Sequence, residues 1–193
     1  SWNNKIDTLY IASSNTKGTA GIQCASHITT DYEYKFATTG KTIHDGFELN
    51  RQSKIKVLTD YQYSTNTPYI IQACSFNDHN CCECEKCFRT ILGLVAEAAD
   101  IKDFGFYLEK PLREHWEDVM YRRSGLMGLG FEQSLYWIDI IPRMKENYDK
   151  MTREQKEFVD WFLTFDFAKM QKESRMRYYR KNFFSIIKRK LRF

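Results

Sequence analysis

Five closely spaced cysteines are the residues of this chain whose type and spacing could do chemistry. Four of them follow the pattern Cys-x6-Cys-x2-Cys-x2-Cys, at Cys74, Cys81, Cys84 and Cys87. Structural zinc prefers four soft ligands in a tetrahedron, and cysteines separated by two residues supply such ligands from tight turns. The spacing therefore predicts a metal site with these four cysteines as its ligands.

Zinc is the expected occupant of this site, and two alternatives stay open. The spacing of Cys81, Cys84 and Cys87 also suits an iron–sulfur cluster, and the cysteines could instead be unligated thiols. Cys82 is a fifth thiol that cannot readily share the same tetrahedron, and His79 is an alternative ligand that the four cysteines make unnecessary. A closed four-cysteine site leaves no position for water, so we expect the zinc to be structural and not catalytic.

The clustering of the cysteines also bears on where the protein is located. A secreted disulfide framework spreads its bridges across a small fold, whereas clustered cysteines are typical of metal sites in a reducing compartment. Residues 1–5 lead into no apolar signal segment, and no stretch of the chain approaches the roughly 18 apolar residues of a membrane span. We therefore expect a cytoplasmic protein, with peripheral attachment to the inner face of the membrane as an open alternative.

Charge is distributed unevenly along the 193 residues. Residues 168–193 contain ten Lys and Arg against one acidic residue, whereas the preceding 167 residues contain 19 basic and 24 acidic groups. An anionic partner is therefore expected to bind this C-terminal segment and not the rest of the chain. Residues 175–193 interleave basic and aromatic residues. This pattern suits RNA binding, a helix on an anionic membrane surface, or a solvated terminal helix, and all three stay open.

The predicted secondary structure changes at the cysteine cluster, from strands and one helix before it to helices after it. Before it, short apolar or extended runs predict strands at residues 8–12, 32–37, 41–45 and 69–73. Asn50 is the predicted N-cap of a helix with Ile55 and Leu58 on its apolar face. We therefore assign residues 1–73 to the α/β fold class.

After the cluster, the spacing of apolar residues changes to the helical period. Helices are predicted at residues 84–99, 112–123 and 131–148, the last bent at Pro142, and at residues that follow Thr152 and Phe167. Thr152 and Gln155 have the spacing of a capping box. The chain is thus divided into an α/β segment at 1–73, a zinc knuckle with its helix at 74–100, and an all-helical region at 101–193.

Residues 80–90, Asn-Cys-Cys-Glu-Cys-Glu-Lys-Cys-Phe-Arg-Thr, resemble the Asn-Cys-Gly-x-Cys-x-x-Cys-x-Arg knuckle of the 7-cyano-7-deazaguanine synthases. They are more similar still to related, mostly uncharacterised bacterial proteins, some of them linked to surface-polysaccharide genes. All of these belong to the PP-loop ATP pyrophosphatases, also called adenine nucleotide alpha-hydrolase-like proteins. The resemblance covers approximately residues 7–100.

That resemblance implies a partial Rossmannoid fold and an ATP-dependent enzyme. Such an enzyme adenylates a carbonyl or carboxylate oxygen, releases pyrophosphate, and lets an amine or ammonia displace AMP. Residues that match later blocks of the superfamily are implied to form the rim of an ATP or substrate site: Ser26, His27, His44, Asp45, Arg51 and Lys54. No catalytic residue is assigned. Apart from the resemblance, these residues are typical of polar loops and of a solvated helix face.

Two departures from the family pattern matter. Cys82 replaces the knuckle glycine, so a turn that calls for positive φ has to tolerate a side chain. The Ser-Gly-Gly-x-Asp-Ser loop that cradles the ATP phosphates is absent, and the glycine-rich residues 125–130 lie among helices and do not replace it. Either an N-terminal PP-loop segment of the same protein precedes these residues, or the lineage kept a zinc module and lost catalysis.

The sequence therefore predicts the C-terminal, zinc-binding part of an ATP-dependent adenylating or amidating enzyme. We expect this part to be inactive alone, with ATP and magnesium bound only if an upstream PP-loop segment is present. The alternative is a non-enzymatic, zinc-stapled interaction module whose basic tail binds a membrane surface or RNA.

Overall fold

The structure, a computed structural model, describes five stretches of the chain. They are residues 8–12, 41–46, 48–74, 77–123 and 139–166, together with positions 169, 172, 173, 176 and 180. These residues are mostly helical, and the chain divides into two compact units, Ser1–Tyr61 and Gln62–Phe193. None of the described helices combines the length and the hydropathy that a membrane span needs.

Several predicted features lie outside the described residues. They are the extended segment 32–37, the rim residues Ser26 and His27, the glycine-rich residues 125–130, and all but two positions of the tail 175–193. The structure does not test these features, and they stay predictions.

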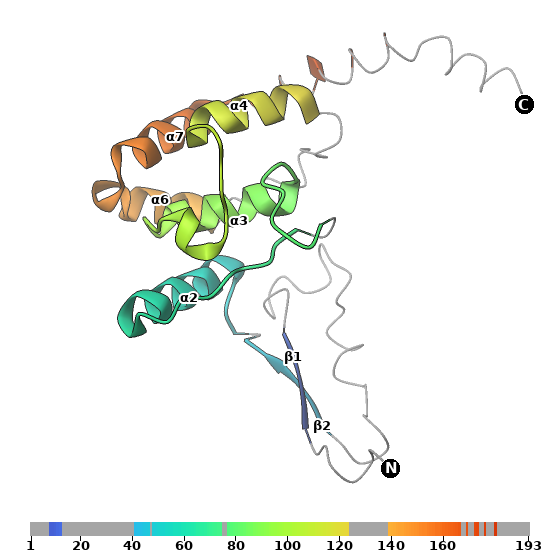
Figure 1. Ribbon diagram of the computed structural model, residues 1–193, viewed down its shortest axis with the longest axis vertical. Coiled ribbons are helices and arrows are strands. Elements are labelled where there is room, and N and C mark those ends of the chain that lie inside the picture. The colour runs from blue at the N-terminus through green and yellow to red at the C-terminus, as the bar shows by residue number, and fades with distance from the viewer. Residues whose placement is uncertain are drawn as a thin grey trace, which may run out of the picture. The chain divides into compact units, whose positions relative to one another are not determined.

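In the first unit, two short strands pair in parallel (Figure 1). β1 (Thr8–Ala12) and β2 (Lys41–Asp45) have the predicted bounds, and Tyr10 lies opposite Ile43 in their register. Parallel strands require a crossover connection, and they occur mainly in sheets whose faces are covered by helices. Two strands do not by themselves make a Rossmannoid segment, which stays a prediction.

Helix α2 (Arg51–Thr65) follows the second strand. Its N-cap is Asn50, as predicted, because Asn50 Oδ1 accepts a hydrogen bond from Ser53 N at 2.7 Å. Of the two residues predicted for its apolar face, Ile55 is buried and Leu58 is exposed. The buried face of this helix is instead mostly polar, because its other buried residues are Gln52, Thr59 and Gln62.

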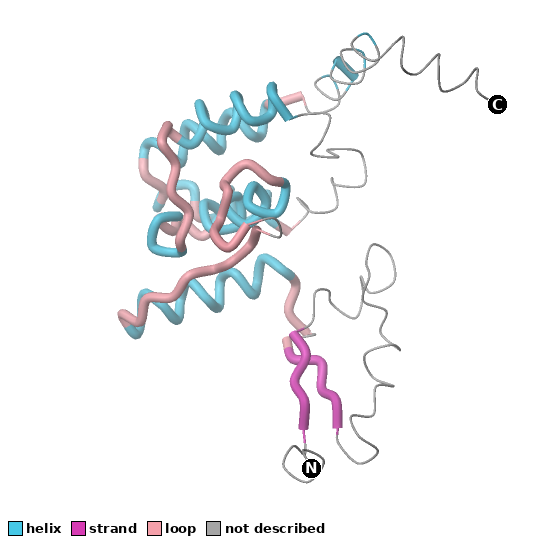
Figure 2. The backbone as a smooth tube through the Cα atoms, turned by 45° about the vertical axis from the view of Figure 1, so that its right-hand side comes forward, coloured by secondary structure: helices cyan, strands magenta, loops and turns pink. Residues whose placement is uncertain are grey.

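The second unit is helical after the cysteines. Its elements are α3 (Glu85–Ala96), η3 (Ile101–Phe104), α4 (Leu112–Arg123), α6 (Ile140–Glu146), η5 (Tyr148–Lys150) and α7 (Arg153–Thr164). α3 packs against α6 and α4 packs against α7, and both pairs can be followed in Figures 1 and 2. The prediction of a helical region after the cysteines is confirmed for the described residues.

An aromatic core joins α3, α4 and α7. Phe88 of α3, Trp116 of α4 and Phe158 of α7 are fully buried. The ring centroid of Phe88 lies 4.4 Å from that of Trp116 and 6.2 Å from that of Phe162. Burial of one such side chain stabilises a fold by about 1.5–3 kcal/mol. The apolar face of α3 therefore anchors this helix in the unit.

Polar side chains cover the backbone at the end of α3. Asn147 Nδ2 donates to Ala96 O at 2.9 Å, and Gln155 Nε2 donates to Ala99 O at 2.7 Å. Gln155 also completes the predicted capping box with Thr152 at the start of α7. The bond to Ala96 O satisfies a carbonyl group at the C-terminal end of α3, and the bond to Ala99 O satisfies one in the turn that follows.

Two predicted elements differ from the structure. Residues 69–73 are not a strand: Ile71 N donates to Phe104 O at 3.1 Å, but the described residues form no ladder there. The helix predicted at residues 131–148 is shorter in its described part, which is α6. Pro142 lies in the first turn of α6, where a proline is tolerated, and not at a bend.

Two tyrosines pack edge-on against Phe104 and differ in the surroundings of their hydroxyl groups. The Tyr63 hydroxyl donates to Asp103 Oδ2 and accepts from Asp100 N, both at 3.1 Å. The Tyr69 hydroxyl is buried, and no hydrogen-bond partner reaches it among the described residues. Burial raises the pKa of Tyr69 to about 12. The hydroxyl of Tyr69 therefore destabilises the fold, whereas that of Tyr63 stabilises it.

Tyr69→Phe should raise the free energy of unfolding at pH 7 by about 1 kcal/mol, because it removes a buried hydroxyl without a partner. The matched control Tyr63→Phe should lower it by about the same amount. Because burial raises the pKa of Tyr69 in the folded state from 10.0 to about 12, Tyr69 ionises first in the unfolded state, and the wild-type protein loses stability as the pH rises from 10 toward 12. The advantage of Tyr69→Phe in urea unfolding should therefore grow above pH 10. Equal effects of the two substitutions would contradict this expectation.

Candidate metal centre

The four predicted ligands come together in the structure. The sulfur atoms of Cys74, Cys81, Cys84 and Cys87 all lie within 4.8 Å of one another. Three of these side chains are buried and that of Cys81 is half-buried. Sulfurs bound tetrahedrally at 2.3 Å from one zinc ion stand about 3.8 Å apart, and the Cys81 and Cys87 sulfurs are 4.0 Å apart. The cluster could therefore hold a metal ion such as zinc.

The start of α3 positions two of the ligands. Cys84 is the N-cap of the helix, and its sulfur accepts a hydrogen bond from Cys87 N at 3.4 Å. Cys87 lies in the first turn, so its side chain projects from the same end of the helix. The positive end of the helix dipole favours thiolates over thiols at this position. The helix thus supplies both the geometry and part of the electrostatic field that a thiolate site needs.

Burial controls the ionisation of the cluster. Burial raises the pKa of the Cys87 thiol, and the neighbouring Cys84 raises it further. Burial also raises the pKa of Cys81, although the hydrogen bond from the backbone of Glu83 opposes this shift. Cys81 and Cys87 therefore keep their protons near neutral pH until a cation displaces them, and binding of a divalent metal should release these protons.

Cys82 is buried beside the cluster and is not one of its members. Its side chain is 3% exposed, and burial raises its pKa to about 11. Its φ is +54°, which agrees with the positive φ expected where the family knuckle has glycine. A side chain in this conformation costs about 1–2 kcal/mol. His79 is exposed and also lies outside the four-residue cluster.

Helix α4 contacts the knuckle turn, residues 81–84, through His115. His115 Nε2 lies 2.8 Å from Cys82 O, and a carbonyl oxygen can only accept, so Nε2 carries the proton. The imidazole stands edge-on to the indole of Trp116, with ring centroids 5.2 Å apart. Trp116 is fully buried. The contacts of both residues are therefore those of packing residues and not of metal ligands.

Three of the residues predicted for the ATP rim, Asp45, Arg51 and Lys54, lie at the end of β2 and the start of α2. Burial lowers the pKa of Lys54, while Glu48 and Asp45 raise it and Arg51 lowers it. These groups therefore lie near one another at the carboxyl end of the strand and the start of α2. Of the other predicted rim residues, His44 is part of β2. Ser26 and His27 lie outside the described residues.

Gly46 also lies in this region, although it is not among the predicted rim residues. Its φ is +65°, and a Cβ built on it would lie 3.1 Å from Lys54 Cε. The side chain of Lys54 thus lies over a turn that favours glycine. The signal was the Asp-Gly step directly after a predicted strand, at residues 45–46.

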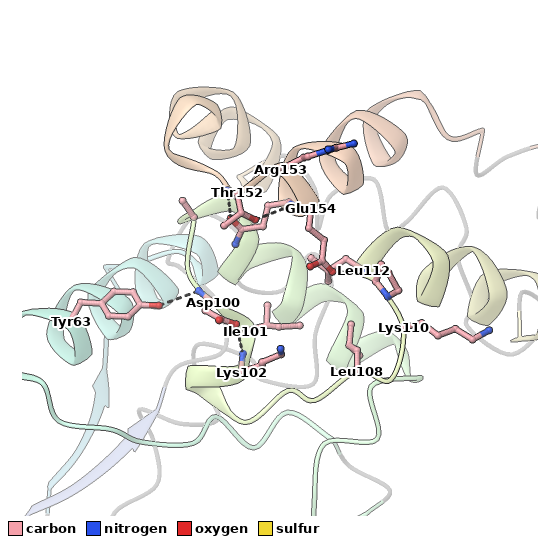
Figure 3. A pocket seen from close by; sticks show the side chains of 13 residues that line it. Tyr63, Asp100, Ile101, Lys102, Leu108, Lys110, Leu112, Thr152, Arg153 and Glu154 are labelled. Carbon is pink, nitrogen blue, oxygen red and sulfur yellow. Dashed lines mark hydrogen bonds between the residues drawn. The ribbon is translucent and has the colours of Figure 1, made fainter.

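A cavity of about 700 Å³ lies in the second unit (Figure 3). Among the side chains that line it, Asp100 Oδ1 accepts from Lys102 N at 3.0 Å, and Glu154 Oε1 accepts from Leu112 N at 2.9 Å. Its two carboxylates therefore cap helix starts. The cavity could not be predicted from the sequence, because its walls come from α2, the η3 region, α4 and α7.

Known proteins give no further guide to this site. No family model, no curated protein and no solved structure matches the chain.

His115→Ala should lower the free energy of unfolding by about 1–2 kcal/mol, because it leaves the carbonyl of Cys82 without its donor. His79→Ala is the matched control, since His79 is exposed and should change neither the stability nor the number of bound metal ions. Urea unfolding of the metal-loaded protein measures the first quantity, and metal analysis the second. Loss of metal in His79→Ala would show that His79 is a ligand after all.

Proposed function

We propose that the four cysteines hold a structural zinc ion and that the chain is the zinc-stapled part of a PP-loop-like, ATP-dependent enzyme. One observation carries the metal assignment: four sulfurs within 4.8 Å of one another. In a [4Fe–4S] cluster each cysteine binds a different iron atom, and in a [2Fe–2S] cluster two pairs of cysteines bind different irons, so some of the sulfurs stand farther apart than around a single ion. Spacing this close favours one tetrahedral ion, and four thiolates favour zinc.

The role of the zinc follows from its ligand number. Four cysteines complete the tetrahedron and leave no position for water or substrate. The ligands join the segment that holds Cys74, the knuckle turn and the start of α3. Zinc at this point therefore staples three parts of the second unit together.

The enzymatic part of the proposal is supported by the resemblance of residues 80–90 and by the first unit. In open α/β sheets, ligands bind outside the carboxyl ends of the parallel strands. Asp45, Arg51 and Lys54 lie at such an end, where β2 passes through Gly46 into the capped start of α2. Two cations there suit ATP phosphates or a carboxylate substrate. By the resemblance, the whole enzyme would adenylate a carbonyl or carboxylate oxygen and release pyrophosphate.

The rival proposal is a zinc-stapled interaction module without catalysis. It is favoured by the absence of a Ser-Gly-Gly-x-Asp-Ser loop from the sequence. The basic tail, residues 175–193, would then bind an anionic membrane surface or RNA. Turnover of ATP by a form of the protein that includes a PP-loop segment separates the two proposals.

The zinc assignment predicts different outcomes for neighbouring cysteines. The purified chain should carry one zinc ion per molecule, Cys82→Ser should keep it, and Cys84→Ser should lose it. Both substitutions replace a buried thiol by a hydroxyl, so they are matched. Elemental analysis after exhaustive dialysis measures the occupancy. Equal occupancy in both variants, or iron in place of zinc, would contradict the assignment.

The ATP-site proposal predicts weak binding without turnover. The rim offers charge but no converging backbone donors, so we expect a dissociation constant for ATP in the millimolar range, roughly −4 kcal/mol. Lys54→Ala should weaken this binding further, whereas Lys56→Ala, on the exposed side of the same helix, should not. Calorimetry with ATP and magnesium measures the affinity. Pyrophosphate release by the 193-residue chain above background would show that the catalytic groups lie within it.

A further inference from the structure

Cys74 is the ligand that the knuckle turn does not position. Cys81, Cys84 and Cys87 lie in the turn and at the start of α3, but six residues separate Cys74 from Cys81. Contacts outside the turn therefore have to hold Cys74 beside the other three sulfurs.

The carboxamide of Asn80 makes these contacts. Its Oδ1 accepts from Ala73 N at 2.9 Å and from Cys74 N at 3.3 Å. Its Nδ2 donates to Ile71 O at 2.7 Å and to Gly105 O at 3.1 Å. The two donors of the amide and both acceptor positions of its oxygen are used. One side chain thus joins the segment of Cys74, the residue next to Cys81 and the chain after η3.

The groups around Asn80 are specific for an amide. Two backbone N–H groups face the oxygen and two carbonyl groups face the nitrogen, so the orientation of the amide is determined by its neighbours. An aspartate has nearly the same shape but no donors when ionised. It would leave the carbonyls of Ile71 and Gly105 unpaired and would place a negative charge beside four thiols.

Gly105 brings the third segment close enough for this bond. Its φ is +85°, and a Cβ built on it would lie 2.6 Å from Ile70 Cγ2. A side chain at this position would therefore push the two segments apart. The backbone of Tyr107, two residues on, hydrogen-bonds to the Cys82 thiol. The segment after η3 thus supports the knuckle from one side while Asn80 connects it to Cys74.

We infer that Asn80 is a positioning residue of the metal centre, which holds Cys74 in place before the ion binds and thereby raises the affinity for zinc. This inference rests on the proposed zinc site. A ligand that is already ordered loses less conformational freedom when the metal binds. Partners outside the ligand set commonly change metal affinity by 10–100-fold. Asn80 has this effect through the backbone of Cys74 and not by touching the metal.

The test compares Asn80→Asp with Asn77→Asp. Both variants make the same chemical change in the same loop and add the same charge, but Asn77 is exposed. Competition with a chromophoric chelator measures the zinc dissociation constant. We expect Asn80→Asp to bind zinc about 10–100-fold more weakly than the wild type, and Asn77→Asp to bind it within about a factor of two. The cobalt(II) spectrum of Asn80→Asp should also show weaker thiolate-to-metal charge transfer, since Cys74 is displaced.

The outcomes are distinguishable. If Asn80 only stabilised the fold, Asn80→Asp would lower the stability of the metal-free and zinc-loaded protein equally and leave the zinc dissociation constant unchanged, which overturns the inference alone. If Asn80→Asp fails to fold by circular dichroism, Asn80→Ser, which keeps one donor and one acceptor, decides by the same measurement: weaker binding supports the inference and unchanged binding overturns it. A wild-type protein that binds no zinc overturns the proposed function and this inference together.

Discussion

The gathering of four cysteine sulfurs in a largely buried place is the constraint on which the second unit depends. Burial disfavours thiolates, and each thiolate disfavours the next, so the cluster is stable as thiols or with a bound cation that attracts the thiolates. The neighbouring residues have conformations and hydrogen bonds that keep the four sulfurs together. Cys84 caps α3, Cys82 adopts a positive φ, Asn80 holds the backbone before Cys74, and His115 holds the carbonyl of Cys82. Binding of a metal there would be free energy of folding.

Helix α3 connects the cysteine cluster to the core of the second unit. Its N-terminal end carries Cys84 and Cys87, its apolar face packs into the aromatic core through Phe88, and its last carbonyl, Ala96 O, accepts from Asn147. A disturbance at the cysteines would thus reach α4 and α7 through contacts within the unit. This arrangement suits a structural role, because a closed site with no free coordination position holds chain segments together and offers nothing to a substrate.

Local patterns in the sequence predicted those parts of the structure that depend on local interactions. The cysteine spacing, the Asn50 cap, the capping box at Thr152 and the bounds of α4 needed only neighbouring residues. The strand predicted at residues 69–73 failed because apolar, extended-type residues do not reveal whether a partner strand is present. There the amide of Asn80 takes backbone groups that a ladder would use. The roles of Asn80, His115 and the cavity walls depend on residues distant in sequence, and no spacing could show them.

Zinc K-edge X-ray absorption on the purified chain tests the central claim most directly, because it reports both the identity of the metal and the atoms bound to it. We expect one zinc ion with four sulfur neighbours at about 2.3 Å and with no nitrogen or oxygen neighbour. A zinc ion with nitrogen or oxygen ligands, iron with sulfur and iron neighbours, or a purified protein without metal would contradict the structural zinc centre.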